Sequence, residues 1–162
     1  MKNIVVLGGG FAGLWAAVGA ARARAEAGFT PADLAITLID KNSFHNIRVR
    51  NYEADLRPVT VPLQKVLGPI QVESLCAAVE AVDTSEQTVQ INGPSGPQLL
   101  PYDRLIIALG SQLNKPDIPG LKQHSFDVDT YYGALRLQAH LKTLASQPDT
   151  EARNTVLVVG RG

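Results

Sequence analysis

The hydrophobic pattern of the first forty residues predicts a strand, a helix and a second strand. Residues 4–7 are a continuous apolar run that ends at Gly8, which is typical of a strand buried on both faces. Residues 13–27 are rich in alanine and predict a helix. Residues 34–39 form a second apolar run that closes at Asp40. Together these elements predict a β-α-β unit with a right-handed connection.

The middle of the chain predicts an antiparallel meander in place of a second helical crossover. Residues 70–76 hold a short third strand, and residues 78–83 and 88–91 alternate apolar and polar positions on either side of a polar loop. Residues 98–100 add a third antiparallel strand after a turn rich in glycine and proline. Residues 105–109 return to the buried, parallel type of strand.

The C-terminal part predicts one more helix and one more strand. An apolar stripe predicts a helix from about residue 130 to residue 145, capped by Asp127 or Asp129. Residues 155–159 read as another buried strand, followed at once by Gly160, Arg161 and Gly162. A strand that ends in glycines therefore occurs at both ends of the sequence.

The glycines after the first predicted strand fit the pattern G-x-G-x-x-G at the start of a helix. Gly8 permits a tight turn, Gly10 lets the backbone approach a pyrophosphate, and Gly13 allows the helix to pack closely on the strand. The free amides and the positive dipole end of the helix favour phosphate. The pattern predicts a dinucleotide site. A glycine-rich turn without a ligand is the alternative.

Asp40 stands at the tip of the second predicted strand, where a carboxylate can accept hydrogen bonds from ribose hydroxyls. A carboxylate there repels a 2′-phosphate, so NADP is disfavoured at this site. The alternative is that Asp40 only caps a turn with Asn42 and Ser43.

Composition narrows the class of protein. Hydrophobic residues make up 45% of the 162 residues, charged residues 19%, and the formal net charge is zero. This balance gives no electrostatic case for a nucleic-acid partner or an anionic membrane surface. Cys76 is the only cysteine, which excludes an intramolecular disulfide and suits a reducing compartment. The glycines of the first apolar run argue against a signal peptide that would end at residues 21–23, so we expect the cytoplasm.

Four motifs in this order resemble the pyridine nucleotide-disulfide oxidoreductase superfamily, which binds FAD first and NAD(P)H second. They are the glycine turn, Asp40, the segment from Tyr102 to Ser111, and the strand with Gly-x-Gly at residues 156–162. The resemblance implies an α/β fold: a Rossmann-like FAD-binding domain with a parallel sheet and an antiparallel β-meander crossover. It assigns residues 1–150 to that domain and residues 151–162 to the first strand of an NAD(P)H-binding domain.

Within that superfamily, the chain is most similar to the type II NADH dehydrogenases, which are NADH:quinone oxidoreductases. Residues 40–46 resemble the Asp-Arg-x-x-Tyr-His loop of that branch. The chain lacks the cysteine pair of the disulfide reductases, and His45 stands where other branches keep one cysteine. The resemblance implies FAD as cofactor, NAD(P)H as co-substrate and a quinone-like acceptor, with membrane contact only through a further C-terminal region. Because most of the NAD(P)H domain is absent from these residues, we expect no sustained NADH oxidation by this chain alone.

The resemblance also implies which residues contact the cofactor. They are Gly8, Gly10, Phe11, Ala12, Gly13, Asp40, Lys41, Arg48, Val79, Ala108 and Gly110. Arg48 and Arg50 either neutralise the cofactor's charge or form a solvated face. His45 is either a proton donor or a packed or solvent-facing histidine. No catalytic residue and no metal ligand is assigned.

Two other functions fit parts of the sequence. A dinucleotide-binding module without turnover would need only the β-α-β unit. A flavoprotein monooxygenase or amine oxidase also opens with the glycine pattern, but the second strand with Gly-x-Gly at residues 156–162 argues against it.

Overall fold

The computed structural model describes residues 2–160 and divides the chain into two compact units. One unit comprises the residues up to Ile47 together with Arg57–Asn114, and the other comprises Arg48–Leu56 together with the residues from Lys115 onward. The strands are β1 (Lys2–Leu7), β2 (Leu34–Asp40), β3 (Phe44–Asn46), β4 (Thr60–Pro62), β5 (Glu73–Cys76), β6 (Ala78–Asp83), β7 (Thr88–Gly93), β8 (Gly96–Pro101) and β9 (Arg104–Ile107). The helices are α1 (Phe11–Glu26), α2 (Leu63–Leu67), α3 (Leu121–His124) and α4 (Tyr131–Leu144), with 3-10 turns at Arg48–Arg50, Arg57–Val59 and Gly68–Ile70.

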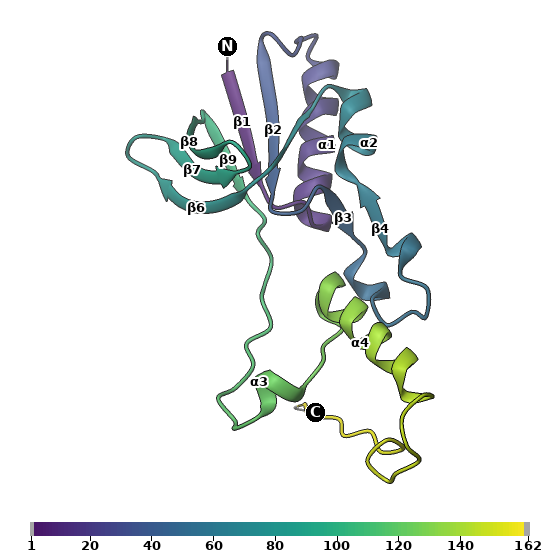
Figure 1. Cartoon of the computed structure of the whole chain (residues 1–162). Helices are drawn as coiled ribbons and strands as arrows, with labels where there is room; N and C mark the ends of the chain where they lie inside the picture. The colour runs from purple at the N-terminus through teal and green to yellow at the C-terminus, as the bar shows by residue number, and fades with distance from the viewer. Residues whose placement is uncertain (1, 161–162) are drawn as a thin grey trace. The chain divides into compact units, whose positions relative to one another are not determined.

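A four-stranded parallel sheet in the order β5-β2-β1-β9 forms the centre of the first unit (Figure 1). β1 and β2 pair in register from Lys2 with Leu34 to Leu7 with Ile39, and α1 connects them. This confirms the predicted β-α-β unit. The parallel strands all end at one edge of the sheet, where the loops that follow them meet.

The apolar residues of the central strands alternate between two separate hydrophobic clusters, which explains why the strands read as continuous apolar runs. Val6 and Leu38 pack with α1 and α2 on one face of the sheet, whereas Val5, Leu7 and Ile39 pack with β6 and β7 on the other. The sheet is thus covered by helices on one face and by the meander on the opposite one (Figure 1).

The meander is a three-stranded antiparallel sheet in the order β6-β7-β8. A register shift between Val79 and Ala81 marks a bulge in β6, and Val89 and Ile91 of β7 are buried against the parallel sheet. This confirms the predicted crossover from β5 to β9 through antiparallel strands.

The prediction that residues 105–109 are buried on both faces is wrong, although the strand itself is present and parallel. β9 is an edge strand of the described sheet, and Ile107 is 66% exposed. Its start is fixed by Asp103, whose carboxylate accepts hydrogen bonds from Lys2 Nζ and from the backbone N–H of Asn3, each at 2.7 Å. These donors hold the pKa of Asp103 below its ordinary value.

Arg24 is the one buried cation among the described residues, and it ties α1 to two other segments. Its side chain donates to the backbone oxygens of Leu34 (3.1 Å), Ile70 (2.8 Å) and Gln71 (3.2 Å). These bonds join the end of α1 to the start of β2 and to the turn that precedes β5. Burial of a guanidinium is tolerated here because its N–H groups find acceptors.

The second unit is built on α4. The residue that caps the N-terminus of this helix is neither of the two that were predicted, Asp127 and Asp129. Thr130 is the N-cap residue, and its hydroxyl accepts a hydrogen bond from Gly133 N at 3.0 Å. Asp127 instead accepts a hydrogen bond from the backbone N–H of Thr130, in the turn that precedes the helix. Asp129 pairs with Arg48. The carboxylates of Asp127 and Asp129 thus support the turn before α4, whereas Thr130 caps the helix itself.

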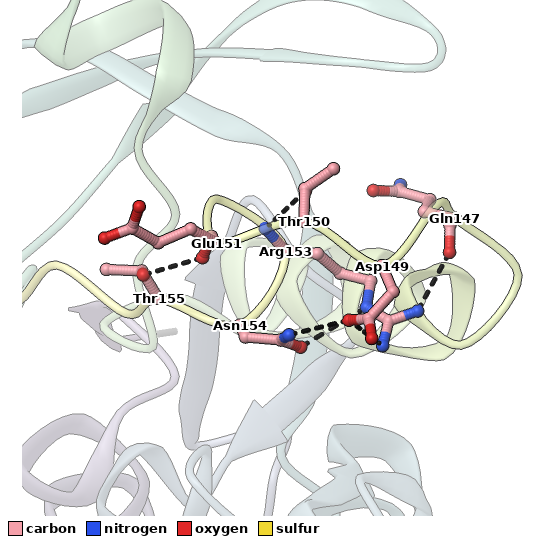
Figure 2. Close-up of polar contacts among 7 residues, drawn as sticks. All are labelled: Gln147, Asp149, Thr150, Glu151, Arg153, Asn154 and Thr155. Carbon is pink, nitrogen blue, oxygen red and sulfur yellow. Dashed lines mark hydrogen bonds and ion pairs between the residues drawn. The ribbon is translucent and has the colours of Figure 1, made fainter.

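The segment after α4 is an ordered turn held by the side chain of Arg153 (Figure 2). Arg153 donates to Asp149 Oδ1 and to the backbone oxygen of Gln147, each at 2.9 Å, and Asn154 also donates to Asp149 Oδ1 at 2.9 Å. The predicted boundary between residues 150 and 151 falls inside this turn. The two compact units divide the chain elsewhere, and the two-domain assignment stays a prediction.

The strand predicted over residues 155–159 is not formed in the part of the chain that the structure describes. Val156, Leu157 and Val158 are 82–86% exposed and have no regular secondary structure. A strand needs a neighbour to accept and donate its backbone hydrogen bonds, and no other described segment pairs with this one. Of the predicted Gly-x-Gly, Arg161 and Gly162 lie outside the described residues.

We predict that Arg24→Leu lowers the free energy of unfolding by at least about 2 kcal/mol, because it removes the donor of three backbone oxygens, those of Leu34, Ile70 and Gln71. The matched control is Arg22→Leu on the same helix, since Arg22 is exposed and only pairs with Glu26 one turn away. The control should change stability by less than about 0.5 kcal/mol. Urea unfolding followed by circular dichroism measures both. Equal losses for the two variants would contradict the anchoring role of Arg24.

Candidate functional site: a glycine loop at the carboxyl edge of the sheet

The glycine loop, Asp40 and Ala108 lie where β1, β2 and β9 end, at the edge where β5 also ends. Backbone hydrogen bonds continue the parallel pairing just beyond the strands: Gly8 N to Ile39 O (2.7 Å), Ala77 N to Asp40 O (2.9 Å) and Ala108 N to Leu7 O (2.8 Å). The glycine loop, Asp40 and Ala108 are therefore neighbours on one edge. Ligands of parallel α/β folds bind at this edge.

Gly8 and Gly13 are required by the packing of the loop itself. Gly8 has a φ of +105°, and a Cβ there would lie 2.2 Å from the backbone oxygen of Ala108. A Cβ on Gly13 would lie 1.8 Å from the backbone oxygen of Gly8. Neither contact is possible for a larger residue, so these two glycines bring β1, α1 and the end of β9 into direct backbone contact.

Gly10 differs from the other two because nothing in the protein requires it to be glycine. Its φ of −70° and ψ of −174° suit any residue, and a Cβ there would meet no atom within 4 Å. Gly10 is the N-cap of α1, with no side-chain cap and no acidic residue in the first turn. The amides of Phe11, Ala12 and Gly13 precede the first α-helical donor, Leu14 N, which bonds to Gly10 O. This open space beside uncapped amides fits a phosphate group.

The carboxylate of Asp40 lies against the loop and spans two backbone donors. Asp40 Oδ2 accepts from Gly9 N at 2.6 Å, and Oδ1 accepts from Asn42 N at 2.7 Å. The turn-capping bond of the alternative interpretation is thus present. Each carboxylate oxygen has a second acceptor direction, so the cap and a ribose contact are compatible.

His45 is buried, 4% exposed, under the glycine loop, and the sequence left open whether it is packed. Its Nδ1 lies 2.8 Å from Gly9 O, and its ring meets Phe11 edge-on with 4.7 Å between centroids. The packed-histidine alternative is therefore confirmed. The signal available in the sequence was weak: His45 is the middle residue of β3, and its burial depends on its pairing with Val61 of β4, sixteen residues later.

The other predicted contacts fall into two groups. Lys41 follows Asp40 at the carboxyl edge, where its backbone oxygen lies 3.5 Å from the Cys76 thiol, and Gly110 follows Ala108 with a φ of +73°. Val79 lies in β6, where it packs against the hydrophobic cluster on the meander face. Their roles as cofactor contacts stay predictions.

Arg48 and Arg50 belong to the second compact unit and have acidic partners there. Arg48 Nε donates to Asp129 Oδ1 at 3.0 Å, with a second donor from Nη2. Arg50 forms a bidentate pair with Glu53 at 2.6 and 2.8 Å, which raises the pKa of Arg50 and lowers that of Glu53. The guanidinium predicted to bind the cofactor is thus already paired with a carboxylate, and a cofactor contact from Arg48 stays a prediction.

A glycine loop at the carboxyl edge of a parallel sheet with a meander crossover defines a dinucleotide-binding α/β protein. The family of pyridine nucleotide-disulphide oxidoreductases matches residues 2–162, and the chain belongs to this family. This confirms the predicted fold class and family. An NADH dehydrogenase-like protein from Mycobacterium tuberculosis is 48% identical over the whole chain, which covers 40% of that relative. Demethylphylloquinone reductase from Synechocystis is 33% identical over 99% of the chain and 40% of its own length.

Further similarities agree with the predicted branch. Type II NADH:quinone oxidoreductases of two staphylococci are 26% and 28% identical, again with 40% of their length covered. The sulfide:quinone oxidoreductase of Aquifex aeolicus superposes with a TM-score of 0.73 and 27% identity, over 91% of this chain and 33% of that one. The chain thus spans about two fifths of the length of its curated relatives.

We predict that Gly13→Ala lowers the free energy of unfolding by about 3 kcal/mol or more, because the new methyl overlaps the Gly8 carbonyl. Gly10→Ala is the control on the same loop and should change stability by less than about 1 kcal/mol. Thermal and urea unfolding of both variants check this. A Gly13→Ala protein as stable as the control would show that the loop is wider than described.

Proposed function

We propose that this chain is the FAD-binding part of an oxidoreductase that passes electrons from NAD(P)H through the flavin to a quinone or a similar acceptor. The observation that supports this proposal most directly is the presence of glycine at position 10. Its backbone angles allow any residue and its Cβ position is open. A ligand lying against the loop is then the remaining reason for glycine at this point, and a pyrophosphate is the group that such loops approach.

In this proposal the chain's own residues bind and orient the adenosine diphosphate half of FAD. The first-turn amides of α1, from Phe11 to Gly13, donate to the diphosphate, and Asp40 accepts from the ribose hydroxyls. Lys41, Val79, Ala108 and Gly110 contribute the remaining contacts of the first unit. FAD itself, when bound, supplies the redox chemistry.

The meander supports FAD over NAD as the ligand of this site. A simple dehydrogenase continues from its third parallel strand into another helix. Here β5 leads instead into β6, β7 and β8, and β9 returns to the sheet beside β1. The relatives that are similar in sequence include a demethylphylloquinone reductase and type II NADH:quinone oxidoreductases, and their names support a quinone acceptor.

The remaining parts of the proposal concern the whole protein. Residues 1–150 form the FAD domain, and residues 151–162 begin an NAD(P)H domain. We also propose that the whole protein is cytoplasmic and contacts the membrane peripherally through a further region. Among the helices of residues 2–160, none combines the length and the apolar character that a membrane span requires.

We predict that the purified chain binds FAD more tightly than NAD and that Gly10→Val abolishes FAD binding. A branched side chain at Gly10 would occupy the space that the pyrophosphate needs, while the fold has room for it. Quenching of FAD fluorescence, with NAD as competitor, measures binding, and circular dichroism verifies that the variant is folded.

Two outcomes would contradict this proposal. Binding of NAD without FAD would replace the flavoprotein by a non-catalytic nucleotide-binding module, the alternative that the sequence left open. Unchanged FAD affinity in folded Gly10→Val would remove the glycine loop from the site.

We predict that Asp40→Ala weakens FAD binding by about 1–3 kcal/mol, the usual effect of losing a charge-assisted hydrogen bond. The matched control is Asp83→Ala, because Asp83 caps the β6–β7 turn through Ser85 N and Glu86 N, each at 2.9 Å. Isothermal titration of both variants with FAD checks this. If Asp40→Ala binds FAD as the control does, Asp40 acts only as a turn cap.

A further inference from the structure

The peptide groups on both sides of Gly9 are held by side chains from two other elements. Gly9 N donates to Asp40 Oδ2 at 2.6 Å, and Gly9 O lies 2.8 Å from His45 Nδ1. A Cβ on Gly9 would lie 3.1 Å from Leu63 Cδ1 and 3.2 Å from Asp40 Cβ, so the residue is also packed from the side. The middle of the glycine loop is therefore fixed in position and in orientation.

The hydrogen bond between His45 and Gly9 O defines which nitrogen of the imidazole ring carries the proton. Gly9 O is a carbonyl oxygen and only accepts, so Nδ1 must carry the proton and donate. The ring itself is held by the pairing of β3 with β4, in which His45 lies opposite Val61, and by the edge contact with Phe11. Because His45 is buried, water does not replace this donor if the ring is lost.

The hydrogen bond from His45 to Gly9 O also fixes the direction of the Gly10 N–H, because both groups belong to one peptide unit. The C=O of Gly9 and the N–H of Gly10 belong to the same planar trans peptide and point in opposite directions. When His45 holds Gly9 O, the Gly10 N–H is therefore directed away from His45. The same rule applies one residue earlier, where the Gly9 N–H points to Asp40 and Gly8 O points to Gly13.

We propose that His45 is a positioning residue for diphosphate binding: it holds the Gly9–Gly10 peptide in the orientation that presents the Gly10 amide to the phosphates. This inference rests on the proposed function of the loop as a dinucleotide site. It gives His45 a role through the backbone and without proton transfer to a substrate. Without the donor, the Gly9–Gly10 peptide is free to rotate and the amide loses its direction. The adenosine end of the ligand, at Asp40, does not depend on this peptide.

The experiment compares ADP with adenosine as ligands of the full chain by isothermal titration. In His45→Leu we expect the dissociation constant for ADP to rise about tenfold, the factor for one lost hydrogen bond, while that for adenosine changes less than about twofold. His45→Asn should restore ADP binding to within about threefold, because the Asn amide can place a donor near Nδ1. His124→Leu, at an exposed histidine, is the control.

Each result separates the proposal from a purely structural role. Unchanged ADP affinity in folded His45→Leu overturns it, as does an equal loss of ADP and adenosine or a failure of Asn to rescue. If His45→Leu does not fold, nitrogen NMR of the wild-type ring decides: a proton on Nδ1 supports the proposal, and a proton on Nε2 alone overturns it. A wild-type chain that binds neither ADP nor FAD overturns the proposed function together with this inference.

Discussion

Three backbone segments approach each other at the carboxyl end of β1 more closely than side chains would allow. The Gly8 carbonyl occupies the place of a Gly13 side chain, and the Ala108 carbonyl occupies the place of a Gly8 side chain. This contact determines where α1 starts and how it lies over β1. It also leaves the first-turn amides at the sheet edge. The position of the candidate site follows from it.

The sheet that carries this edge depends on the alternation of side chains in β1 and β2. Each strand sends every second apolar residue toward α1 and α2 and the others toward the meander. A one-residue slip in register would exchange the two sets and would move the ends of the strands relative to one another. The two hydrophobic clusters thus maintain the alignment of Gly8, Asp40 and Cys76 at the edge.

The sequence predicted the parts of the fold that are encoded locally. The glycine loop, α1, Asp40 at the end of β2, and the meander all have strong short-range signals, and each was confirmed. The predictions that failed depend on partners. Residues 155–159 are apolar enough for a strand but have none to pair with among the described residues, and β9 is exposed because it lies at an edge.

The same reason explains what the sequence did not indicate at the site. His45 becomes a buried donor only because β3 pairs with β4, and both strands are only three residues long. Arg48 was predicted either to neutralise the cofactor's charge or to form a solvated face, yet Asp129, 81 residues away in sequence, accepts a hydrogen bond from it. Neither contact can be inferred from spacing along the chain, since both are made by tertiary structure.

The buried guanidinium of Arg24 has a consequence for the energetics of ligand association. It fixes the far end of α1 to β2 and to the turn before β5, while the glycine contacts fix the near end. A helix held at both ends does not have to become ordered when a ligand arrives at its N-terminus. Association at this loop would therefore lose little conformational entropy in the protein, and its free energy would come mainly from the contacts that the ligand itself makes.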